Sequence, residues 1–253
     1  MHNLIKQIGI KQIYDGIPER LTKSYYGRKI MAAYNAYGSG YDFCRFYACE
    51  NPDGSFGTVH IYNSSMVIDG SVDTDDISML IKMTKPANIE ISGGTLLQPE
   101  GYAMRHRTLF KAVPNKTDVD FNNVNVNINA EDCYKILAES FENMGSFEDW
   151  YVDISHRIRH GVSELYYYGD TTVTKNFDID GFVFVSHIAT AETARGKGGA
   201  RRLLYCLAER FAKEEKEVHL FALDHRKTFY EAIGFEPVAE DILFERKELL
   251  IGD

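Results

Sequence analysis

A buried strand, a glycine-rich loop and an amphipathic helix follow one another directly in the second half of the chain, and this order constrains the fold most. Residues 182–190 (FVFVSHIAT) form a near-continuous apolar run, which is typical of a strand covered on both faces. The loop that follows carries three glycines, which permit positive φ angles and close backbone approach: Gly196, Gly198 and Gly199. Apolar residues then recur with helical spacing: Leu203, Leu204, Leu207, Ala208 and Phe211. This order predicts an α/β fold.

The loop and the start of the helix together predict a binding site for an anion. The first turn of a helix presents free backbone N–H groups and the positive end of the helix dipole. Four basic residues add positive charge to this segment: Arg195, Lys197, Arg201 and Arg202. The glycine spacing matches neither the Walker A loop nor the dinucleotide fingerprint. A pyrophosphate group is the expected ligand.

Two segments of the second half resemble the sequence motifs of the GNAT-type N-acetyltransferases. Arg195-x-x-Gly198-x-Ala200 is similar to the family motif (Q/R)-x-x-G-x-(G/A). Residues 229–235 (FYEAIGF) resemble the second family signature, which is usually met as FYEKLGF. The order of elements expected over residues 124–253 is also similar to the GNAT order, so the resemblance covers about half of the chain.

The resemblance implies acetyl-coenzyme A as the co-substrate, without a metal ion. It implies that the strands 182–190 and 218–223 separate into a V-shaped cleft, in which the pantetheine arm pairs with the backbone of Ile188, Ala189 and Thr190. It further implies that the pyrophosphate is held by the segment Arg195, Gly196, Lys197, Gly198, Gly199, Ala200 and Arg201. In this family the acetyl group passes directly to an amine, without an acyl-enzyme.

The resemblance also indicates a proton donor, but it leaves the base open. Tyr230 matches the tyrosine that many GNAT enzymes use to protonate the departing thiolate, with simple packing as the competing explanation. The glutamate that family members often carry early on the preceding strand is absent. His187 is the candidate catalytic substitute, although a lone histidine in an apolar run is more often a packed residue. Glu192, the pair Asp224 and His225, and a chain of water molecules are further candidates for the base.

Three further groups of residues have simple structural explanations. His156 and His160 share a helix face but lack the glutamate of the H-E-x-x-H zinc motif, so no metal is expected. Strand alternation sends Tyr167 to one face and its neighbours to the other, so only part of Tyr166–Tyr168 could contact an acceptor. Cys206 falls on the apolar side of its helix, which indicates a core residue.

The first half has the pattern of a small α/β domain without a phosphate-binding loop. A helix with an apolar stripe (Leu21, Tyr25, Ile30 and Tyr34) is expected to end at Gly38–Gly40, and a second helix to begin at Asp73–Asp76. Apolar runs predict strands over residues 43–49, 58–68, 88–92 and 103–113. This domain is a candidate for a degenerate GNAT-like copy, with a role in closing the acceptor site or in homodimer contacts.

An asparagine-rich stretch between residues 111 and 130 marks the division of the chain. We therefore expect an α/β protein with a mixed sheet: an N-terminal α/β domain over residues 1–122 and a GNAT acetyltransferase domain over residues 123–253. Within the second domain, the alternating residues 124–128 predict a strand, Gly169-Asp170 predicts a tight hairpin turn, and residues 242–248 are expected to close the sheet.

The whole excess of negative charge lies in the second half. The net charge of the chain is −9. Residues 1–123 hold 13 basic and 13 acidic side chains, whereas residues 124–253 hold 15 basic and 24 acidic side chains. This balance argues against a nucleic-acid partner held by phosphate contacts. It favours a cationic acceptor, either a small molecule or a peptide with a primary amine, although solubility alone also explains acidic surface.

Composition also indicates the compartment. No run of 18 uncharged apolar residues occurs, so no membrane partner is expected, and the first residues lack the apolar core of a signal peptide. Four cysteines without a C-x-x-C pair predict a reducing, cytoplasmic environment. Two functions besides acetyl transfer stay open: a non-catalytic protein that binds coenzyme A as a sensor or interaction partner, and a transferase for a longer acyl group.

Overall fold

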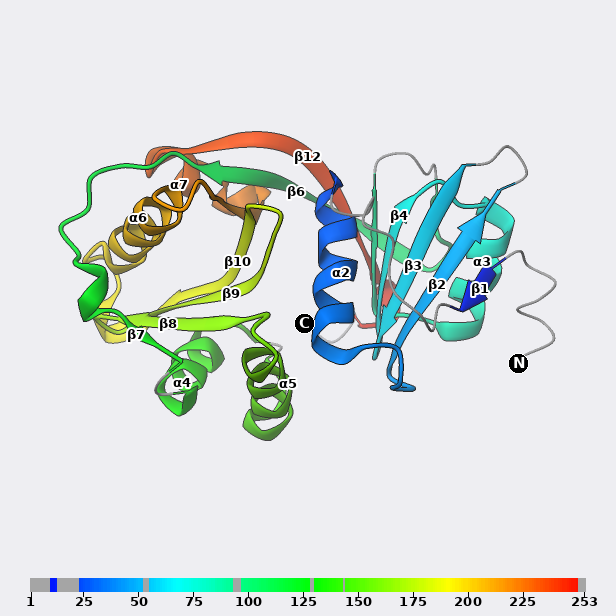
Figure 1. Ribbon diagram of the computed structural model, residues 1–253, viewed down its shortest axis with the longest axis horizontal. Coiled ribbons are helices and arrows are strands. Elements are labelled where there is room, and N and C mark those ends of the chain that lie inside the picture. Colours follow the sequence, from blue (N-terminus) through cyan, green and yellow to red (C-terminus); the bar gives the residue numbers. More distant parts are fainter. Residues whose placement is uncertain are drawn as a thin grey trace. The chain divides into compact units, whose positions relative to one another are not determined.

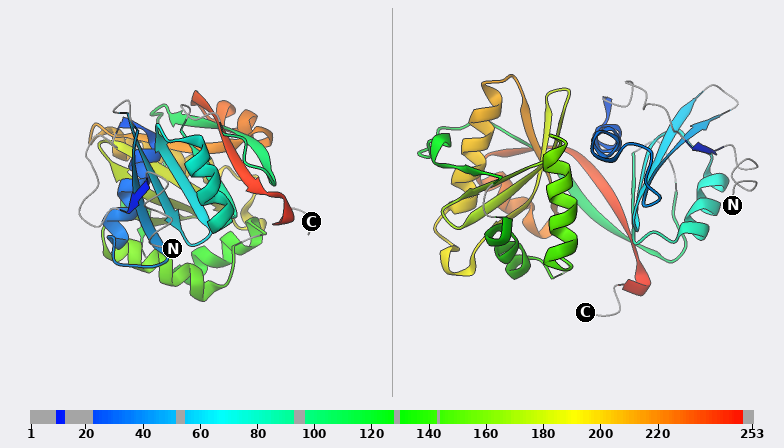
Figure 2. Two further views of the ribbon diagram at one scale, coloured as in Figure 1. Left: turned by 90° about the vertical axis from the view of Figure 1, so that its right-hand side faces the viewer. Right: turned by 60° about the horizontal axis from the view of Figure 1, so that its bottom comes forward.

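The structure is a computed structural model that describes residues 10–12, 23–51, 55–92, 97–127, 130–142 and 144–249 (Figures 1 and 2). The chain divides into two compact units, Met1–Arg107 with Asp241–Asp253 and Thr108–Glu240. This division differs from the expected boundary near residue 122, because strands β6 (Tyr102–Ala112) and β12 (Phe235–Arg246) each continue from one unit into the other. Within the described ranges, no helix is long and apolar enough to cross a membrane.

The second unit is built on a mixed sheet with the strand order β12-β6-β11-β10-β9-β8-β7. Its remaining strands are β7 (Asn125–Val126), β8 (Glu164–Tyr168), β9 (Thr171–Ile179), β10 (Phe182–Thr190) and β11 (Glu217–Leu223). Strands β7 to β10 pair antiparallel, whereas β10 and β11 pair parallel. The predicted hairpin turn is confirmed: Gly169 and Asp170 both have positive φ, as a type I′ turn between β8 and β9 requires.

Helices cover both faces of this sheet (Figure 1). They are α4 (Ala130–Ser140), α5 (Phe147–Arg159), α6 (Gly199–Ala212) and α7 (Asp224–Ala232). The apolar stripe of α6 packs against Val183 and Val185 of β10 in the larger core. Ile136 and Leu137 of α4 pack instead against Ala189, which places α4 on the opposite face. Ser146 caps α5 by accepting a hydrogen bond from the backbone of Asp149.

The tyrosine cluster and the cysteine behave as strand and helix periodicity predicted. Tyr166 and Tyr168 belong to the core on the α6 side, whereas Tyr167 packs on the α4 side. The Tyr167 hydroxyl donates to the Asp170 carboxylate at 3.0 Å. Cys206 is buried in the α6-side core, and this burial raises the pKa of its thiol to about 11. Both features are therefore explained by packing.

The strands of the first unit belong to the same twelve-stranded mixed sheet, in the order β1-β2-β3-β4-β5-β12-β6. They include β1 (Ile10–Gln12), β2 (Cys44–Glu50), β3 (Phe56–Tyr62), β4 (Ser65–Gly70) and β5 (Asn88–Ile91). Strands β4 and β5 pair parallel, as β10 and β11 do. The single strand predicted over residues 58–68 is wrong, because Asn63 adopts a φ of 48° and the chain turns back between Tyr62 and Ser65.

Side-chain caps define the two helices described in the first unit, α2 (Tyr25–Tyr37) and α3 (Thr74–Thr84). Ser24 accepts a hydrogen bond from the backbone of Gly27, and Gly38 ends α2 with a positive φ. The predicted acidic start of α3 is confirmed: the Asp73 carboxylate accepts from the backbone N–H groups of Asp75 and Asp76. Leu21, from the predicted apolar stripe, lies outside the described residues.

The two units repeat one order of elements, and each unit contains a strand segment from the other repeat. Strands β2, β3 and β4, helix α3 and strand β5 correspond in order to β8, β9, β10, α6 and β11. In the single twelve-stranded sheet β12 lies between β5 and β6, and β6 lies between β12 and β11. The expectation that residues 242–248 close the sheet of the second unit is therefore wrong, since Leu243–Glu245 pair with β5 in the first unit.

Buried charges fix the shared strands within the first unit. Arg107 of β6 donates to Glu90 of β5 at 2.8 Å and to Asp241 of β12 at 2.5 Å. Lys29 of α2 also bonds to Glu90, and Tyr26 to Asp241. Burial alone would raise the pKa of Glu90, but the charges of Lys29 and Arg107 outweigh it and lower the pKa to about 2.

Replacing Glu90 with glutamine should lower the free energy of unfolding at pH 7 by about 3–5 kcal/mol, because Arg107 would lose one buried partner. The carboxylate of Glu90 stabilises the fold above its unfolded pKa, so this contribution should disappear as the pH falls from about 4.5 to about 2. Urea unfolding at both ends of this range measures the difference. Glu217→Gln is the control, because Glu217 pairs with Lys111 on the surface, and its cost should stay below about 1 kcal/mol. Equal costs for both variants would contradict the buried-pair account.

Candidate functional site

Strands β10 and β11 stop pairing part of the way along the sheet of the second unit. Their parallel register runs from Phe182–Glu217 to Phe184–His219 and then ends, although both strands continue. On its other edge, β10 stays paired with β9 as far as Thr190–Thr171. The edge of β10 that faces β11 therefore has no strand partner over residues 185–190 among the described residues. This is the separation that the resemblance to the GNAT family implied for these two strands.

A β-bulge interrupts β10 within this unpaired stretch. The register with β9 shifts between Ser186 and Ala189, so that His187 and Ile188 form the extra segment. His187 has a φ of 48°, which is uncommon for a residue other than glycine. Ile188 packs against the α6-side core, whereas Ala189 packs on the α4 side. Backbone strain of this kind is concentrated at functional sites in proteins.

The glycine-rich loop directly follows β10, and helix α6 begins at its end without a side-chain cap. Gly196 and Gly198 have φ values of 77° and 75°. Gly198 is the N-cap of α6 and provides no side-chain hydrogen bond, so the first backbone N–H groups of the helix have no acceptor in the cap's side chain. A Cβ atom on Gly199 would overlap Thr171 Oγ1 in the β8–β9 hairpin. The glycines therefore serve both the backbone conformation and the close approach of the loop to the sheet.

The four basic residues near the loop differ in what their side chains contact. Arg195 Nε donates to Thr190 O at 3.1 Å, and its Nη2 donates to Ser140 Oγ at 3.2 Å, which ties the loop to the end of α4. Lys197 Nζ donates to Thr193 O at 3.1 Å. Arg202 Nη1 lies 3.9 Å from Asp118 Oδ2. Arg201 shows no side-chain hydrogen bond or ion pair within the described part of the chain.

Tyr230 lies on α7, which begins directly after β11. Its ring packs against three aromatic rings at centroid distances of 5.9, 5.2 and 5.7 Å: Phe110, Phe229 and Phe235. Burial raises the pKa of the Tyr230 hydroxyl to about 12, against an opposing effect of Arg226. The phenol therefore carries its proton at neutral pH, as a proton donor must.

His187 is joined to two polar residues that the sequence did not single out. Ser186 Oγ lies 3.3 Å from His187 Nδ1, and Asn176 Nδ2 of β9 donates to the same oxygen at 2.7 Å. The ring of Phe141 meets the imidazole edge-to-face at 5.8 Å. Burial lowers the pKa of His187, with a smaller opposite effect from Asp153 of α5. The pairing of β9 with β10 brings Asn176 and Ser186 together, so no local sequence pattern could have revealed them.

The remaining candidates for the catalytic base are more exposed than His187. The two histidines of the candidate metal site are too few to hold a metal ion. Glu192, Asp224 and His225 lie at the ends of β10 and β11 and are at least partly exposed. The rings of His156 and His160 lie 4.4 Å apart. Among the residues described here, no group of three or more histidine, cysteine, aspartate or glutamate residues is placed to hold a metal ion.

At the corresponding strand–helix junction of the first unit, the described residues keep their strands paired and their helix capped. Strands β4 and β5 stay paired through Ile68–Ile91, and Ser92 N then donates to Ile68 O at 3.0 Å. The first backbone N–H groups of α3 are already bonded to the Asp73 carboxylate. A negative charge at this helix start opposes an anion. Of the two repeated strand–helix junctions, only the one in the second unit suits a phosphate ligand.

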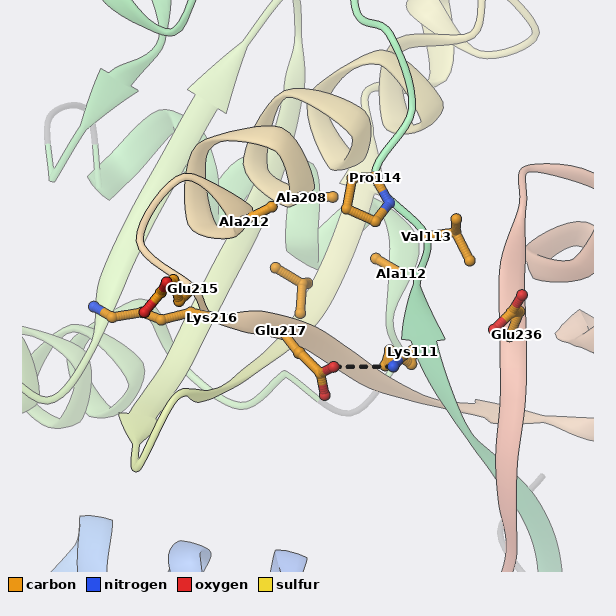
Figure 3. Close-up of a pocket in the computed structure, with 11 residues that line it drawn as sticks. Lys111, Ala112, Val113, Pro114, Ala208, Ala212, Glu215, Lys216, Glu217 and Glu236 are labelled. Carbon is orange, nitrogen blue, oxygen red and sulfur yellow. Dashed lines mark hydrogen bonds and ion pairs between the residues drawn. The ribbon is translucent and has the colours of Figure 1, made fainter.

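A pocket of about 420 Å³ lies near the C-terminal end of α6, opposite the end that follows the glycine-rich loop (Figure 3). Ala208 and Ala212 of α6 line it, together with Glu215 and Glu236. Lys111 also lines it and pairs with Glu217 at 2.9 Å. The acidic residues in its lining and the distance from the loop along α6 separate this pocket from the candidate site.

Solved structures similar to this chain include several acetyltransferases. They include a GCN5-related N-acetyltransferase from Sphaerobacter thermophilus (TM-score 0.54, 14% identity, covering 93% of this chain and 94% of that one). A GNAT-family acetyltransferase from Colwellia psychrerythraea has a TM-score of 0.53 and 12% identity, and the match covers 93% of this chain and 98% of that one. A tandem GNAT protein from the clavulanic acid biosynthesis pathway has a TM-score of 0.51 and 10% identity, and the match covers 93% of this chain and 97% of that one. No protein-family model matches the sequence, and no curated protein matches it either.

These likenesses, together with the sheet topology, define the fold. The chain has the GNAT fold in its second unit and a GNAT-like arrangement in its first, which agrees with the expected degenerate copy. At identities of 14% or less the likeness establishes architecture alone. The same fold can host different activities, which depend on the residues of the site.

Proposed function

We propose that the second unit binds acetyl-coenzyme A and transfers its acetyl group directly to a primary amine. The observation that carries this proposal is the succession of three features along one chain segment. Strand β10 leaves β11 after Phe184, the glycine-rich loop follows, and α6 begins without a side-chain cap. An unpaired strand edge suits an extended amide-containing arm, and an uncapped helix start suits a pyrophosphate.

The coenzyme would then be held mainly by backbone groups. The unpaired edge of Ile188, Ala189 and Thr190 would pair with the pantetheine arm. The backbone N–H groups of Gly196, Lys197, Gly198, Gly199 and Ala200 would hold the pyrophosphate, with the guanidinium of Arg201 adding charge. Arg195 would act by holding the loop in shape, since its side chain bonds to Thr190 and Ser140.

The chemistry then requires two proton transfers. The acceptor amine, with a pKa near ~10.4 for a lysine-like amine, must lose a proton before it attacks the thioester carbon. The C–N bond forms, the carbonyl electrons move to oxygen, and the C–S bond then breaks with its electrons on sulfur. The Tyr230 hydroxyl, which burial keeps protonated at neutral pH, would protonate this thiolate, and the tyrosinate would then regain a proton from water. The amine proton would leave through water or through an accessible group such as Glu192 or Asp224.

Charge supports a cationic acceptor. The second unit holds 22 acidic and 15 basic residues, so most of the net charge of the chain lies in the unit with the proposed site. Residues 130–159, which include α4 and α5, hold seven acidic and three basic residues. His187 contacts Phe141 beside this helix pair. A protonated amine is attracted to such a surface, and an anion is repelled.

The acceptor KM should therefore rise with ionic strength at fixed pH. Salt screens attraction over about 8–10 Å, so a cationic acceptor such as spermidine or a lysine-containing peptide loses local concentration as salt is added. Steady-state rates between low and high sodium chloride measure the effect, with acetyl-coenzyme A saturating throughout. A KM that stays flat or falls would remove the electrostatic argument and leave the acceptor class open.

Release of free thiol from acetyl-coenzyme A in the presence of amines tests the activity itself. The panel should contain a polyamine, an aminoglycoside and a lysine-containing peptide, with an acidic amino acid as the comparison. Amine-dependent thiol release supports a transferase. Tight binding without release would favour the non-catalytic sensor, and release from a longer acyl-coenzyme A alone would favour a transferase for that acyl group.

A further inference from the structure

We propose that His187 serves as a neutral hydrogen-bond donor to the thioester oxygen, held in that state by Ser186 and Asn176, and not as the catalytic base. The inference rests on the proposed function and assigns a different role to a residue that the sequence suggested as a base. Ser186 and Asn176 become positioning residues, because they act on the substrate only through the imidazole.

The direction of the hydrogen bonds determines which imidazole nitrogen carries the hydrogen. Asn176 Nδ2 can only donate, so Ser186 Oγ accepts this bond at 2.7 Å. Within the described residues, the sole other polar neighbour of Ser186 Oγ is His187 Nδ1 at 3.3 Å. In the proposed arrangement the Ser186 hydrogen points to Nδ1, the polar atom within its reach, while Oγ accepts from Asn176. With Nδ1 accepting, the neutral imidazole carries its hydrogen on Nε2.

The surroundings of the ring keep it neutral. Burial is the larger influence on His187 and lowers its pKa, whereas the Asp153 carboxylate on α5 acts in the opposite direction. Phe141, just after α4, meets the ring edge-to-face and adds an apolar neighbour. In a histidine whose Nε2 carries hydrogen, the lone pair lies on Nδ1, and here it is directed at Ser186 and away from an incoming amine.

The backbone places this donor at the open part of the sheet. His187 comes three residues after Phe184, the last residue of β10 that pairs with β11, and one residue before the stretch proposed to hold pantetheine. Because of the bulge and the positive φ at His187, the imidazole does not follow the regular alternation of side chains between the two faces of β10. The backbone of His187 therefore directly precedes the stretch proposed to hold the acyl arm.

The chemistry gives such a donor a defined task. When the amine nitrogen bonds to the thioester carbon, the carbonyl electron pair moves to oxygen and negative charge develops there. The Nε2–H group stabilises this oxyanion without giving up its proton, and the electron pair re-forms the carbonyl when the C–S bond breaks. Removing one donor of this kind costs about 10²–10³ in kcat.

The tautomer can be tested directly by nitrogen NMR with ¹⁵N-histidine-labelled protein. We expect a pyridine-type Nδ1 and a pyrrole-type Nε2 for His187 at pH 7.5, assigned by the signals missing in His187→Gln. Ser186→Ala should remove the preference by deleting the hydroxyl donor. A pyrrole-type Nδ1 with a pyridine-type Nε2 in the wild type would overturn the proposal, whatever the activity of the protein.

Variant kinetics separate a donor from a base. His187→Gln keeps an N–H group of similar reach, so kcat should stay within about tenfold of wild type with an unchanged pH profile, whereas His187→Ala should lose about 10²–10³. Equal losses in both variants, together with loss of the acidic limb, would identify a base and overturn the proposal. Calorimetry with acetyl-coenzyme A runs in parallel: absent binding in the wild type would count against the proposed function, while the tautomer measurement still tests His187 separately.

Discussion

Replacing Gly198 with glutamate is expected to weaken acetyl-coenzyme A binding at least about 100-fold. Gly198 has a φ of 75° at the N-cap of α6, so any side chain strains the loop. A carboxylate there also competes with the pyrophosphate for the free N–H groups of the helix. Two lost charge-assisted hydrogen bonds, at about 1.5–3 kcal/mol each, account for a loss of this size.

A matched variant separates strain from binding. Gly161 has a φ of 71° with open space around its Cβ position, and it follows α5, away from the loop. Gly161→Glu should therefore destabilise the fold to a similar degree but leave the affinity for acetyl-coenzyme A unchanged. Isothermal titration calorimetry on both variants decides the matter. Wild-type affinity in Gly198→Glu would rule out the loop as the pyrophosphate site.

Replacing Tyr230 with phenylalanine is expected to lower kcat by about 10²–10⁴ while the dissociation constant for acetyl-coenzyme A changes little. The ring contacts with Phe110, Phe229 and Phe235 would remain, and only the hydroxyl would be lost. Because burial raises the pKa of this hydroxyl to about 12, the wild-type hydroxyl should keep its proton, and the rate it supports, throughout the neutral and mildly alkaline range.

Tyr205→Phe is the control for this variant. Tyr205 lies on α6 and packs against the same core as Tyr230, so this variant also removes one tyrosine hydroxyl beside that core. Its kcat should equal that of the wild type. If Tyr230→Phe also retained wild-type kcat across the pH range, the thiolate would leave without help from this residue, and Tyr230 would be a packing residue.

The segment from β10 to α6 was predictable because its signals are local. An apolar run, three glycines and a helical stripe follow each other, and the predicted strand 182–190 coincides with β10. The caps at Ser146 and Asp73 are likewise local, since each side chain bonds to a backbone N–H group two or three residues away. Such features depend on a few neighbouring residues and little on the rest of the fold.

Features set by pairing between distant strands were not predictable. The exchange of β6 and β12 depends on contacts between residues far apart in the sequence, such as Phe244 with Ile89, and no local pattern specifies them. The Asn63 turn was missed for a different reason: strand-forming residues continue on both sides of it. In the site, the bond from Asn176 to Ser186 exists only because β9 pairs with β10.

The stoichiometry of acetyl-coenzyme A binding to the full chain tests the central claim most directly. The second unit has the separated strands and the uncapped helix, whereas in the first unit β4 and β5 stay paired and Asp73 occupies the start of α3. A calorimetric titration should therefore give one site per chain, and Gly198→Glu should weaken binding at that site at least about 100-fold. Two sites per chain, or no binding at all, would contradict the assignment of a single coenzyme site to the second unit.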